Sequence, residues 1–358
     1  MVWGGPLGSA APLFVVARPA MMTSVAAPPP ADTPVLPPRA ERSAEPLALT
    51  PALCTLCGVE DADPVAVGAD FEYRTCPDEF LAVRCRRCGL VYLNPRPADA
   101  EAGRIYPNDY HAFAFKPAEY GLVYRVRRRL EARRLLAWAR HLPADARVLD
   151  VGCGDGFHLA LLRDYGPPTW TLEGLDGDAR AVAAARANGL EVRAERLEHA
   201  GLPAATFHLV LLVMTVENLP DPAATMRLVA GLLAPGGRVV VVTDNTDSPD
   251  RKLFGGRHWG GYHFPRHTYL FNRATLTRLG VLAGLTPVRV VTAVSPVNWV
   301  YSVRNWLDDW GGPRWLVNRF SLKSVPALAV FTLLDAAFNL VNRGAILHGT
   351  FEKPGAVK

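Results

Sequence analysis

The stretch RVLDVGCGDGF, residues 147–157, constrains the fold of this 358-residue chain more than any other part of it. It joins a short apolar run to a helical pattern through three glycines at alternate positions, 152, 154 and 156. Glycine tolerates left-handed backbone angles and lets the main chain approach a ligand closely. A strand, a glycine turn and a helix in this order predict a turn that binds a nucleotide-like ligand at the edge of a parallel sheet.

Short apolar runs and helical patterns alternate from residue 147 onward, which predicts an α/β fold with a largely parallel sheet. We expect strands at 147–152, 171–176, 190–195, 207–214, 238–244, 286–294 and 345–353. We expect helices at 157–165, 178–189, 221–234 (with Pro-Gly-Gly after it) and 272–285, with Asn272 as the amino-terminal cap of the last. With 49% hydrophobic and 20% charged residues, the composition is that of a globular protein with a substantial core.

The glycine spacing distinguishes between nucleotide cofactors. A dinucleotide fingerprint counted from Gly152 requires a third glycine at 157, where this chain has phenylalanine. The spacing therefore argues against a nicotinamide-dependent oxidoreductase. Asp176 ends the next predicted strand, where a carboxylate can accept both hydroxyls of a ribose.

Four motifs occur in the order and at the intervals of a known enzyme family: VLDVGCGDG, LEGLDGDARAVAAARANG, FHLVLLVMTVENLPDP and LLAPGGRVVVVT. Over residues 146–294 and the last strand, the chain resembles the class I S-adenosylmethionine-dependent methyltransferases. The resemblance implies a Rossmann-like seven-stranded sheet whose final strand is antiparallel, with S-adenosylmethionine as the cofactor. The cofactor-binding residues that it implies are Asp150, Gly152, Gly154, Gly156, Asp176, Arg196, Leu197 and Met214.

The same resemblance implies a role for each part of this set. Asp150 and the glycine turn are expected near the methionine moiety and the ribose, and Asp176 on the ribose. Arg196 and Leu197 are expected beside the adenine, and Met214, with Thr215, on the floor of the pocket.

The chain departs from the family pattern at two positions. Family members commonly have Phe-Asp where this chain has Phe207-His208, and Glu-His where it has Glu217-Asn218. We expect His208 to be structural. Position 218 is expected on the substrate side, so this chain lacks a histidine general base there.

Two cysteine pairs, Cys54-x-x-Cys57 and Cys85-x-x-Cys88, predict a closed tetrahedral zinc site of structural type. Each pair is followed by a glycine that permits a tight turn around a metal. The phrase CRRCGLVYLNPRP resembles the end of the amino-terminal zinc module in a bacterial branch of these methyltransferases. That branch includes sugar C-methyltransferases, but the carboxy-terminal half does not resemble their extra domain. Unligated thiols, or a module that docks on another macromolecule, stay open as alternatives.

The segment RHWGGYHFPRHTYLF, residues 257–271, contains His258, His263 and His267. Their intervals share no helix face, and the glycines and proline between them predict a loop, so we do not expect a metal site there. In the resembled family this position is a loop that closes over the acceptor. The predicted catalytic set is His263 as a general base with a near-neutral pKa, Arg266 to hold an anionic acceptor, and His267. For His267 an alternative role as an anchor of the loop is favoured.

The predicted organisation has six parts. They are a Pro- and Ala-rich disordered tail at 1–50, a zinc-ribbon-like module at 51–97, a linker and basic helix at 98–145, the S-adenosylmethionine-binding core at 146–295, an aromatic helical insertion at 296–343, and the last strand and tail at 344–358. The insertion holds four of the eight Trp. It is expected to cover an acceptor pocket, to contact a membrane surface peripherally, or simply to pack on the core. No run of eighteen apolar residues predicts a membrane-spanning helix.

These features predict methyl transfer to a small or lipid-like acceptor, with O-methylation favoured over C-methylation. The rival hypothesis is a binding protein that keeps the fold without turnover, which the Glu217-Asn218 change favours and the retained glycines disfavour. Only five of the 39 basic residues are Lys, so a nucleic-acid partner is not expected. The cysteine pairs are typical of a reducing compartment, so we expect a cytoplasmic protein. The sequence does not indicate the oligomeric state.

Overall fold

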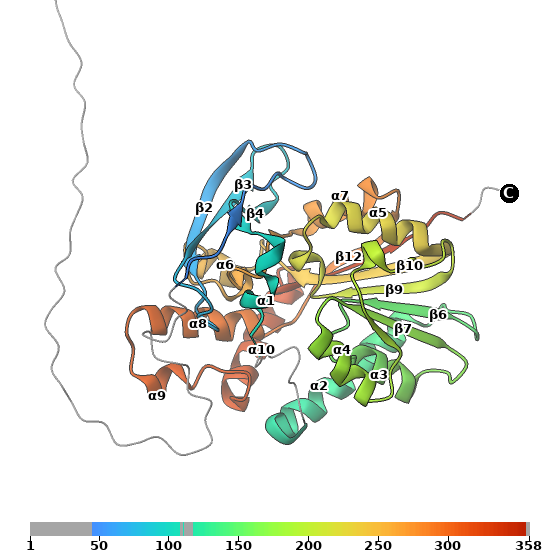
Figure 1. Cartoon of the computed structure of the whole chain (residues 1–358). Helices are drawn as coiled ribbons and strands as arrows, with labels where there is room; N and C mark the ends of the chain where they lie inside the picture. The colour runs from blue at the N-terminus through green and yellow to red at the C-terminus, as the bar shows by residue number, and fades with distance from the viewer. Residues whose placement is uncertain (1–44, 108–109, 111–116, 356–358) are drawn as a thin grey trace, which may run out of the picture. The chain divides into compact units, whose positions relative to one another are not determined.

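The computed structural model describes residues 45–107, 110 and 117–355 (Figure 1). Residues 1–44 of the tail predicted at 1–50 lie outside the described part of the chain. Residues 45–50 are part of the fold, because Leu47 is buried and β1 (Leu49–Thr50) pairs antiparallel with β5 (Arg96–Pro97).

The predicted seven-stranded sheet is confirmed, in the order β12-β13-β10-β9-β6-β7-β8. Its strands are β6 (Arg147–Val151), β7 (Thr171–Asp176), β8 (Val192–Ala194), β9 (Phe207–Val213), β10 (Leu233–Asp244), β12 (Thr286–Ala293) and β13 (Ile346–Glu352). The last strand, β13, runs antiparallel between β10 and β12, whereas β6 to β10 are parallel. β10 begins five residues earlier than predicted, because the preceding helix ends at Leu232 and Leu233 already pairs with Phe207 of β9.

Helices flank this sheet on both faces (Figure 1). α5 (Pro222–Leu232) and α7 (Arg273–Leu282) lie on one face, and α2 (Pro117–Trp138), α3 (Phe157–Tyr165) and α4 (Ala179–Ala187) on the other. The predicted cap of α7 is confirmed, since the Asn272 side chain accepts a hydrogen bond from the N–H of Thr275 in a capping box. His208 is structural as expected, because its Nδ1 accepts the N–H of Arg147 at 3.1 Å and so fixes the start of β6.

The cysteine pairs lie beside a four-stranded antiparallel sheet in the order β11-β4-β3-β2, with Cys85 at the end of β3. Its strands are β2 (Ala62–Ala69), β3 (Glu79–Cys85), β4 (Val91–Leu93) and β11 (Tyr269–Leu270). β11 comes from the histidine-rich segment, so a stretch far along the chain completes the sheet. Residues of this sheet and of the methyltransferase-like sheet also share one hydrophobic core, in which Tyr92 and Val210 are both fully buried. The histidine-rich segment is therefore fixed between the two sheets. After β5 the chain continues through η2 (Asp99–Glu101) and α1 (Ala102–Ile105).

The insertion before the last strand is helical, as predicted. It contains α8 (Val297–Asp309), α9 (Arg314–Val317) and α10 (Val325–Leu340). α8 packs against η6 (Gly260–Tyr262) and α6 (Pro249–Phe254) of the histidine-rich region. Across the part of the chain that the structure describes, no helix combines the length and apolar character needed to cross a membrane.

Candidate functional site

The glycine turn lies at the carboxyl ends of β6 and β7. Gly152, Gly154 and Gly156 have φ angles of 72°, 56° and 78°, in the region that favours glycine. A Cβ on Gly152 would lie 2.6 Å from the Thr215 side chain, so no larger residue fits there. The N–H of Gly154 donates to Asp176 Oδ2 at 2.8 Å, which ties the turn to its acidic partner. The predicted turn and carboxylate are thus brought together.

Asp150 lies beneath this turn and has an unusual environment. It is only 1% exposed, and its Oδ2 has no hydrogen-bond partner among the residues described. Burial and the negative charge of Asp176 raise its pKa to about 8. Two neighbouring buried carboxylates are stabilised by a cation. S-adenosylmethionine carries a sulfonium and an ammonium group, so this donor set fits the predicted cofactor.

The remaining predicted cofactor residues are more scattered. Arg196 is exposed, with Nη1 3.5 Å from Asp99 Oδ2, and Leu197, in η4 (Leu197–His199), is buried in the hydrophobic core. Met214 is 38% exposed at the end of β9, with φ of 53°. Their contacts with adenine and with the methyl group stay predictions.

The histidine-rich segment is buried between the cysteine-bearing sheet and α8. Each of its three histidines faces a different carboxylate. The atom pairs are His258 Nε2 and Asp309 Oδ2 at 2.9 Å, His263 Nδ1 and Glu72 Oε1 at 2.6 Å, and His267 Nδ1 and Asp244 Oδ2 at 3.2 Å. The three histidines therefore share no common carboxylate, although the rings of His263 and His267 are neighbours with centroids 4.9 Å apart. The segment is a loop, as predicted, with one short helical turn, and most of it is buried.

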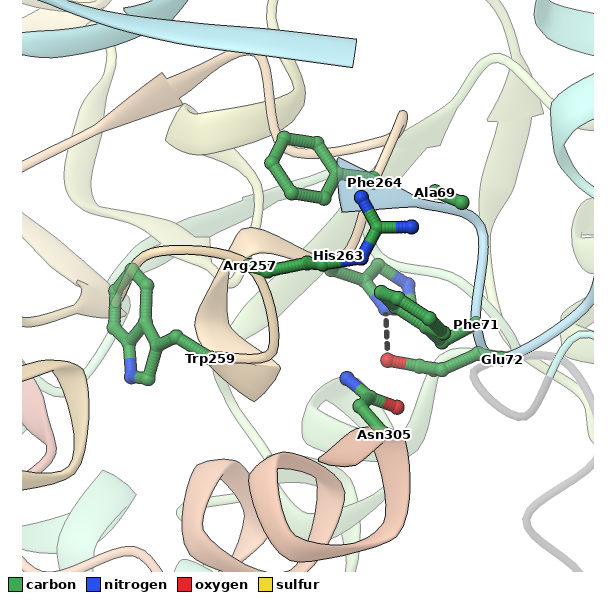
Figure 2. Close-up of a pocket in the computed structure, with 8 residues that line it drawn as sticks. All are labelled: Ala69, Phe71, Glu72, Arg257, Trp259, His263, Phe264 and Asn305. Atoms are coloured by element: carbon green, nitrogen blue, oxygen red, sulfur yellow. Dashed lines mark hydrogen bonds and ion pairs between the residues drawn. The ribbon is translucent and has the colours of Figure 1, made fainter. Parts of the chain in front are cut away.

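His263 lies in a small pocket with Glu72, Phe71 and Asn305 of α8 (Figure 2). We infer that Nδ1 donates its proton to Glu72, which leaves Nε2 as the acceptor, 3.4 Å from the hydroxyl of Tyr110. Burial and the charge of Arg266 lower the pKa of His263 well below its ordinary value. The expectation of a near-neutral pKa was therefore wrong. A desolvated imidazole beside a cation is a weak base.

Arg266 is paired within the protein. Its guanidinium donates to both oxygens of Asp70, at 3.2 and 2.8 Å, and both side chains are fully buried. Burial opposes the charge of Asp70, yet Arg266 holds the pKa of that carboxyl at about 2. Asp70 already supplies a counter-ion to Arg266, and the role of Arg266 in holding an anionic acceptor stays a prediction.

Two carboxylates, those of Glu217 and Asp244, lie next to His267, and sequence analysis did not predict this cluster. Glu217 lies in η5 (Val216–Asn218) after β9, and Asp244 ends β10. One donor atom from each of Glu217, Asp244 and His267 lies within 4.8 Å of the others. We name these three residues the acidic triad. The only signal in the sequence was that Glu217 and Asp244 follow neighbouring strands, whose carboxyl ends meet at one edge of the sheet.

Two members of the acidic triad, Glu217 and His267, have raised pKa values. Glu217 is fully buried, and neither of its carboxylate oxygens is hydrogen-bonded within the described part of the chain. Burial raises its pKa to about 7, while His267 opposes this and Asp244 adds to it. Burial would lower the pKa of His267, but Asp244 and Glu217 raise it. Asp244 is held by Asn298, whose Nδ2 donates to Oδ1 at 2.7 Å.

A pocket opens beside these groups, lined by their sequence neighbours Asn218, Arg266 and Thr268. It is lined by Tyr106, Pro265 and Asn218 among others, so position 218 does face a cavity, as predicted. The pKa of Tyr106 is raised to about 12 mainly by burial, with the charges of Glu217 and Asp176 adding to it. The carboxylates of Glu217 and Asp176 therefore both lie near Tyr106.

Comparison with known proteins identifies the chain. A family model described as "Methyltransferase domain" matches residues 122–290. The ubiquinone biosynthesis O-methyltransferase of Aromatoleum aromaticum is 30% identical over 179 residues, which cover 46% of this chain and 75% of that protein. The chain belongs to the class I S-adenosylmethionine-dependent methyltransferases. As an enzyme of this family it uses S-adenosylmethionine, and the binding of this cofactor by the glycine turn stays a prediction.

The similarity to individual methyltransferases is partial. The ubiquinone biosynthesis O-methyltransferase of Aeromonas salmonicida is 30% identical over 152 residues, which cover 39% of this chain and 62% of that protein. The chain spans 46 to 62% of the length of this relative and of two further ones with the same name. A solved methyltransferase structure from Thermotoga maritima, a possible histamine N-methyltransferase, is 18% identical with a TM-score of 0.44, covering 70% of this chain and 99% of that one.

Binding of S-adenosylmethionine by this methyltransferase is expected to tighten as the pH rises from 6 to 8. Asp150 is largely protonated below its pKa of about 8, and a cationic ligand lowers that pKa, so binding releases a proton. The affinity should rise by up to about tenfold per pH unit in this window. Calorimetric titration in buffers with different ionisation enthalpies measures both effects. Asp150→Asn should abolish the proton release, and the exposed Asp145→Asn should keep it; an unchanged proton count in Asp150→Asn would contradict this.

Proposed function

We propose that this methyltransferase transfers a methyl group to a hydroxyl oxygen of a small or lipid-like acceptor, with methylation of an activated carbon as the second candidate. The observation that carries the proposal is the acidic triad, buried at the carboxyl ends of β9 and β10 beside the glycine turn. A neutral amine can attack the methyl group without a base, whereas a hydroxyl must lose its proton in or before the step. A proton-accepting group at this position therefore favours hydroxyl acceptors.

The cofactor, when bound, supplies an electrophilic methyl group. The chain's own residues align the acceptor and remove its proton. Because His267 Nδ1 lies 3.0 Å from the carbonyl oxygen of Gly261, we assign its proton to that atom and leave Nε2 as the acceptor. The hydroxyl proton passes to Nε2, and Asp244 then stabilises the imidazolium. His263 and Arg266 are positioning residues in this proposal, since Glu72 and Asp70 hold them within the layer above the site.

The pocket and the relatives support the acceptor class. The pocket beside the triad is lined by Tyr106, Pro265 and Asn218, and concave sites of this kind take small molecules. The names of the relatives specify O-methylation in ubiquinone biosynthesis. The reaction of this chain is proposed from the triad together with that similarity.

The proposal includes a structural Zn²⁺ at the four cysteines. Their sulfur atoms all lie within 4.8 Å of one another, and Cys54 Sγ is 3.5 Å from Cys88 Sγ. Gly58 and Gly89, with φ of 65° and 78°, donate their N–H groups to the carbonyl oxygens of the cysteines that begin each pair. Four thiolates with this turn geometry fit a closed zinc site. Because reduced cysteines are typical of the cytoplasm, the proposal also includes a cytoplasmic location.

The test is a methyl-transfer assay with the zinc-loaded full chain. Labelled S-adenosylmethionine is incubated with a water-soluble catechol and with a prenylated catechol, and the products are identified by mass spectrometry. The expected result is a methyl ether together with one S-adenosylhomocysteine per methyl group. Methylation on carbon would overturn the preference for oxygen. Calorimetric binding of S-adenosylhomocysteine with no turnover on either acceptor would favour the rival hypothesis of a silent binding protein.

A further inference from the structure

The outward face of α10 is apolar along its whole length. Nine of its positions are exposed, and Thr332 is the single polar residue among them. Leu333 is 74% exposed and Leu340 is 86% exposed. An exposed helix face of a globular protein is normally polar, and contiguous apolar patches mark interaction surfaces.

The orientation of α10 is fixed by buried contacts on its other side. Asp335 is its one charged residue and is fully buried. Asp335 Oδ2 accepts the N–H groups of Ser295 and Ala345, and Oδ1 accepts the Trp299 Nε1–H. Trp299 also stacks on Phe331 and Phe338, with ring centroids 5.9 and 6.0 Å apart. Because a buried charge requires these partners, the helix cannot rotate to hide its apolar face.

The segment that leads into α10 adds aromatic and cationic groups. Trp310 and Trp315 are 77% and 67% exposed. Tryptophan is favoured where an apolar phase meets water. Arg319, Lys323 and Arg343 are exposed around the helix. Between Gly311 and Gly344 the sequence contains four basic residues, and its one acidic residue is the buried Asp335. The exposed charge of this region is therefore entirely positive.

We propose that α10 and residues 310–323 form a surface that docks on an anionic phospholipid bilayer. We name it the apolar surface. Its leucines and tryptophans would enter the boundary between headgroups and acyl chains, while its cations meet the lipid phosphates. With 16 residues, α10 is too short to span a bilayer, so it lies on the membrane. Figure 1 shows the two helices of this segment, α9 and α10. The proposal concerns binding and does not depend on methyl transfer.

The test is co-sedimentation of the full chain with vesicles. One set contains phosphatidylcholine with 30% phosphatidylglycerol and the other contains phosphatidylcholine alone. The wild-type chain should bind the anionic vesicles at least tenfold more tightly, with a blue shift of tryptophan fluorescence and a marked loss of binding at high salt. Leu333→Glu with Leu340→Glu should lower this binding at least tenfold.

Leu253→Glu is the matched control, because Leu253 is 70% exposed on α6 and lies outside the apolar surface. It should bind as the wild type does. The proposal is overturned if wild type and the double variant bind alike. It is also overturned if light scattering shows a dimer that the double variant abolishes while neither protein binds vesicles. In that case the apolar surface would be covered by a second copy.

Discussion

Replacing His267 by glutamine is expected to lower kcat by about 10²- to 10⁴-fold, which is the usual contribution of a positioned general base. S-adenosylmethionine affinity should stay within about twofold, because the glycine turn and Asp176 are held by their own contacts. We choose His267 as the base because Glu217 and Asp244 raise the pKa of its imidazole, whereas the pKa of His263 is lowered. The measurement is steady-state kinetics with parallel calorimetric titration of the cofactor.

The alternative role of His267 is to anchor the loop through its contact with Gly261. A purely structural role would lower Tm and cofactor affinity together, and it would leave the pH profile of any remaining activity unchanged. Asp244→Asn separates the two roles. Removing this charge should lower the pKa of His267, so the acid limb of kcat should move to lower pH, since the imidazole must be neutral to accept a proton. Asp247→Asn, an exposed carboxylate three residues on, should change nothing.

Two outcomes would contradict the proton-acceptor role of His267. One is an unchanged kcat in His267→Gln. The other is an activity that is lost when divalent cations are removed and restored by adding them, while the cysteine site keeps its zinc. That result would show that Glu217, Asp244 and His267 ligate a cation, since their donor atoms also lie close enough together for that.

The sheet and the glycine turn could be predicted because their signals are local. Strands such as β9 are runs of mostly apolar residues, and the capping residue Asn272 marks the start of α7. The alternating glycines require no knowledge of distant residues either. Because the strand order of this family follows from the motif order, the antiparallel β13 could also be expected.

The partners of the histidine-rich segment could not be predicted, because they are long-range. Glu72 is 191 residues from His263, and Asp70 is 196 residues from Arg266. No periodicity or spacing connects such positions. Burial lowers the pKa of His263, and the sequence alone could not predict that burial. The two-residue strand β11 is likewise too short for a pattern and exists only because β4 offers an edge.

Replacing Cys57 by serine is expected to remove zinc and to loosen the cysteine-bearing sheet. A structural zinc site in a small module contributes on the order of 10 kcal/mol, which is comparable to the whole stability of a domain. The histidine-rich segment depends on this sheet through β11, the Asp70–Arg266 pair and the Glu72–His263 pair. Methyl transfer should therefore fall more than cofactor binding, because the glycine turn belongs to the other sheet. Metal analysis, Tm, the methyl-transfer assay and calorimetric titration of the cofactor at low temperature measure the four effects.

Cys76→Ala is the matched control for this prediction. Cys76 is 1% exposed in the same module but packs with Phe80 and Leu93, outside the four-cysteine cluster. Its substitution should cost about 1–2 kcal/mol of packing and leave one zinc per chain. If Cys57→Ser and Cys76→Ala lower Tm equally and neither changes the metal content, the cysteines are buried thiols and the zinc proposal fails. If Cys57→Ser loses zinc but keeps full turnover, the zinc module does not support the site, and the histidine-rich segment must be held by α8 and β10 alone.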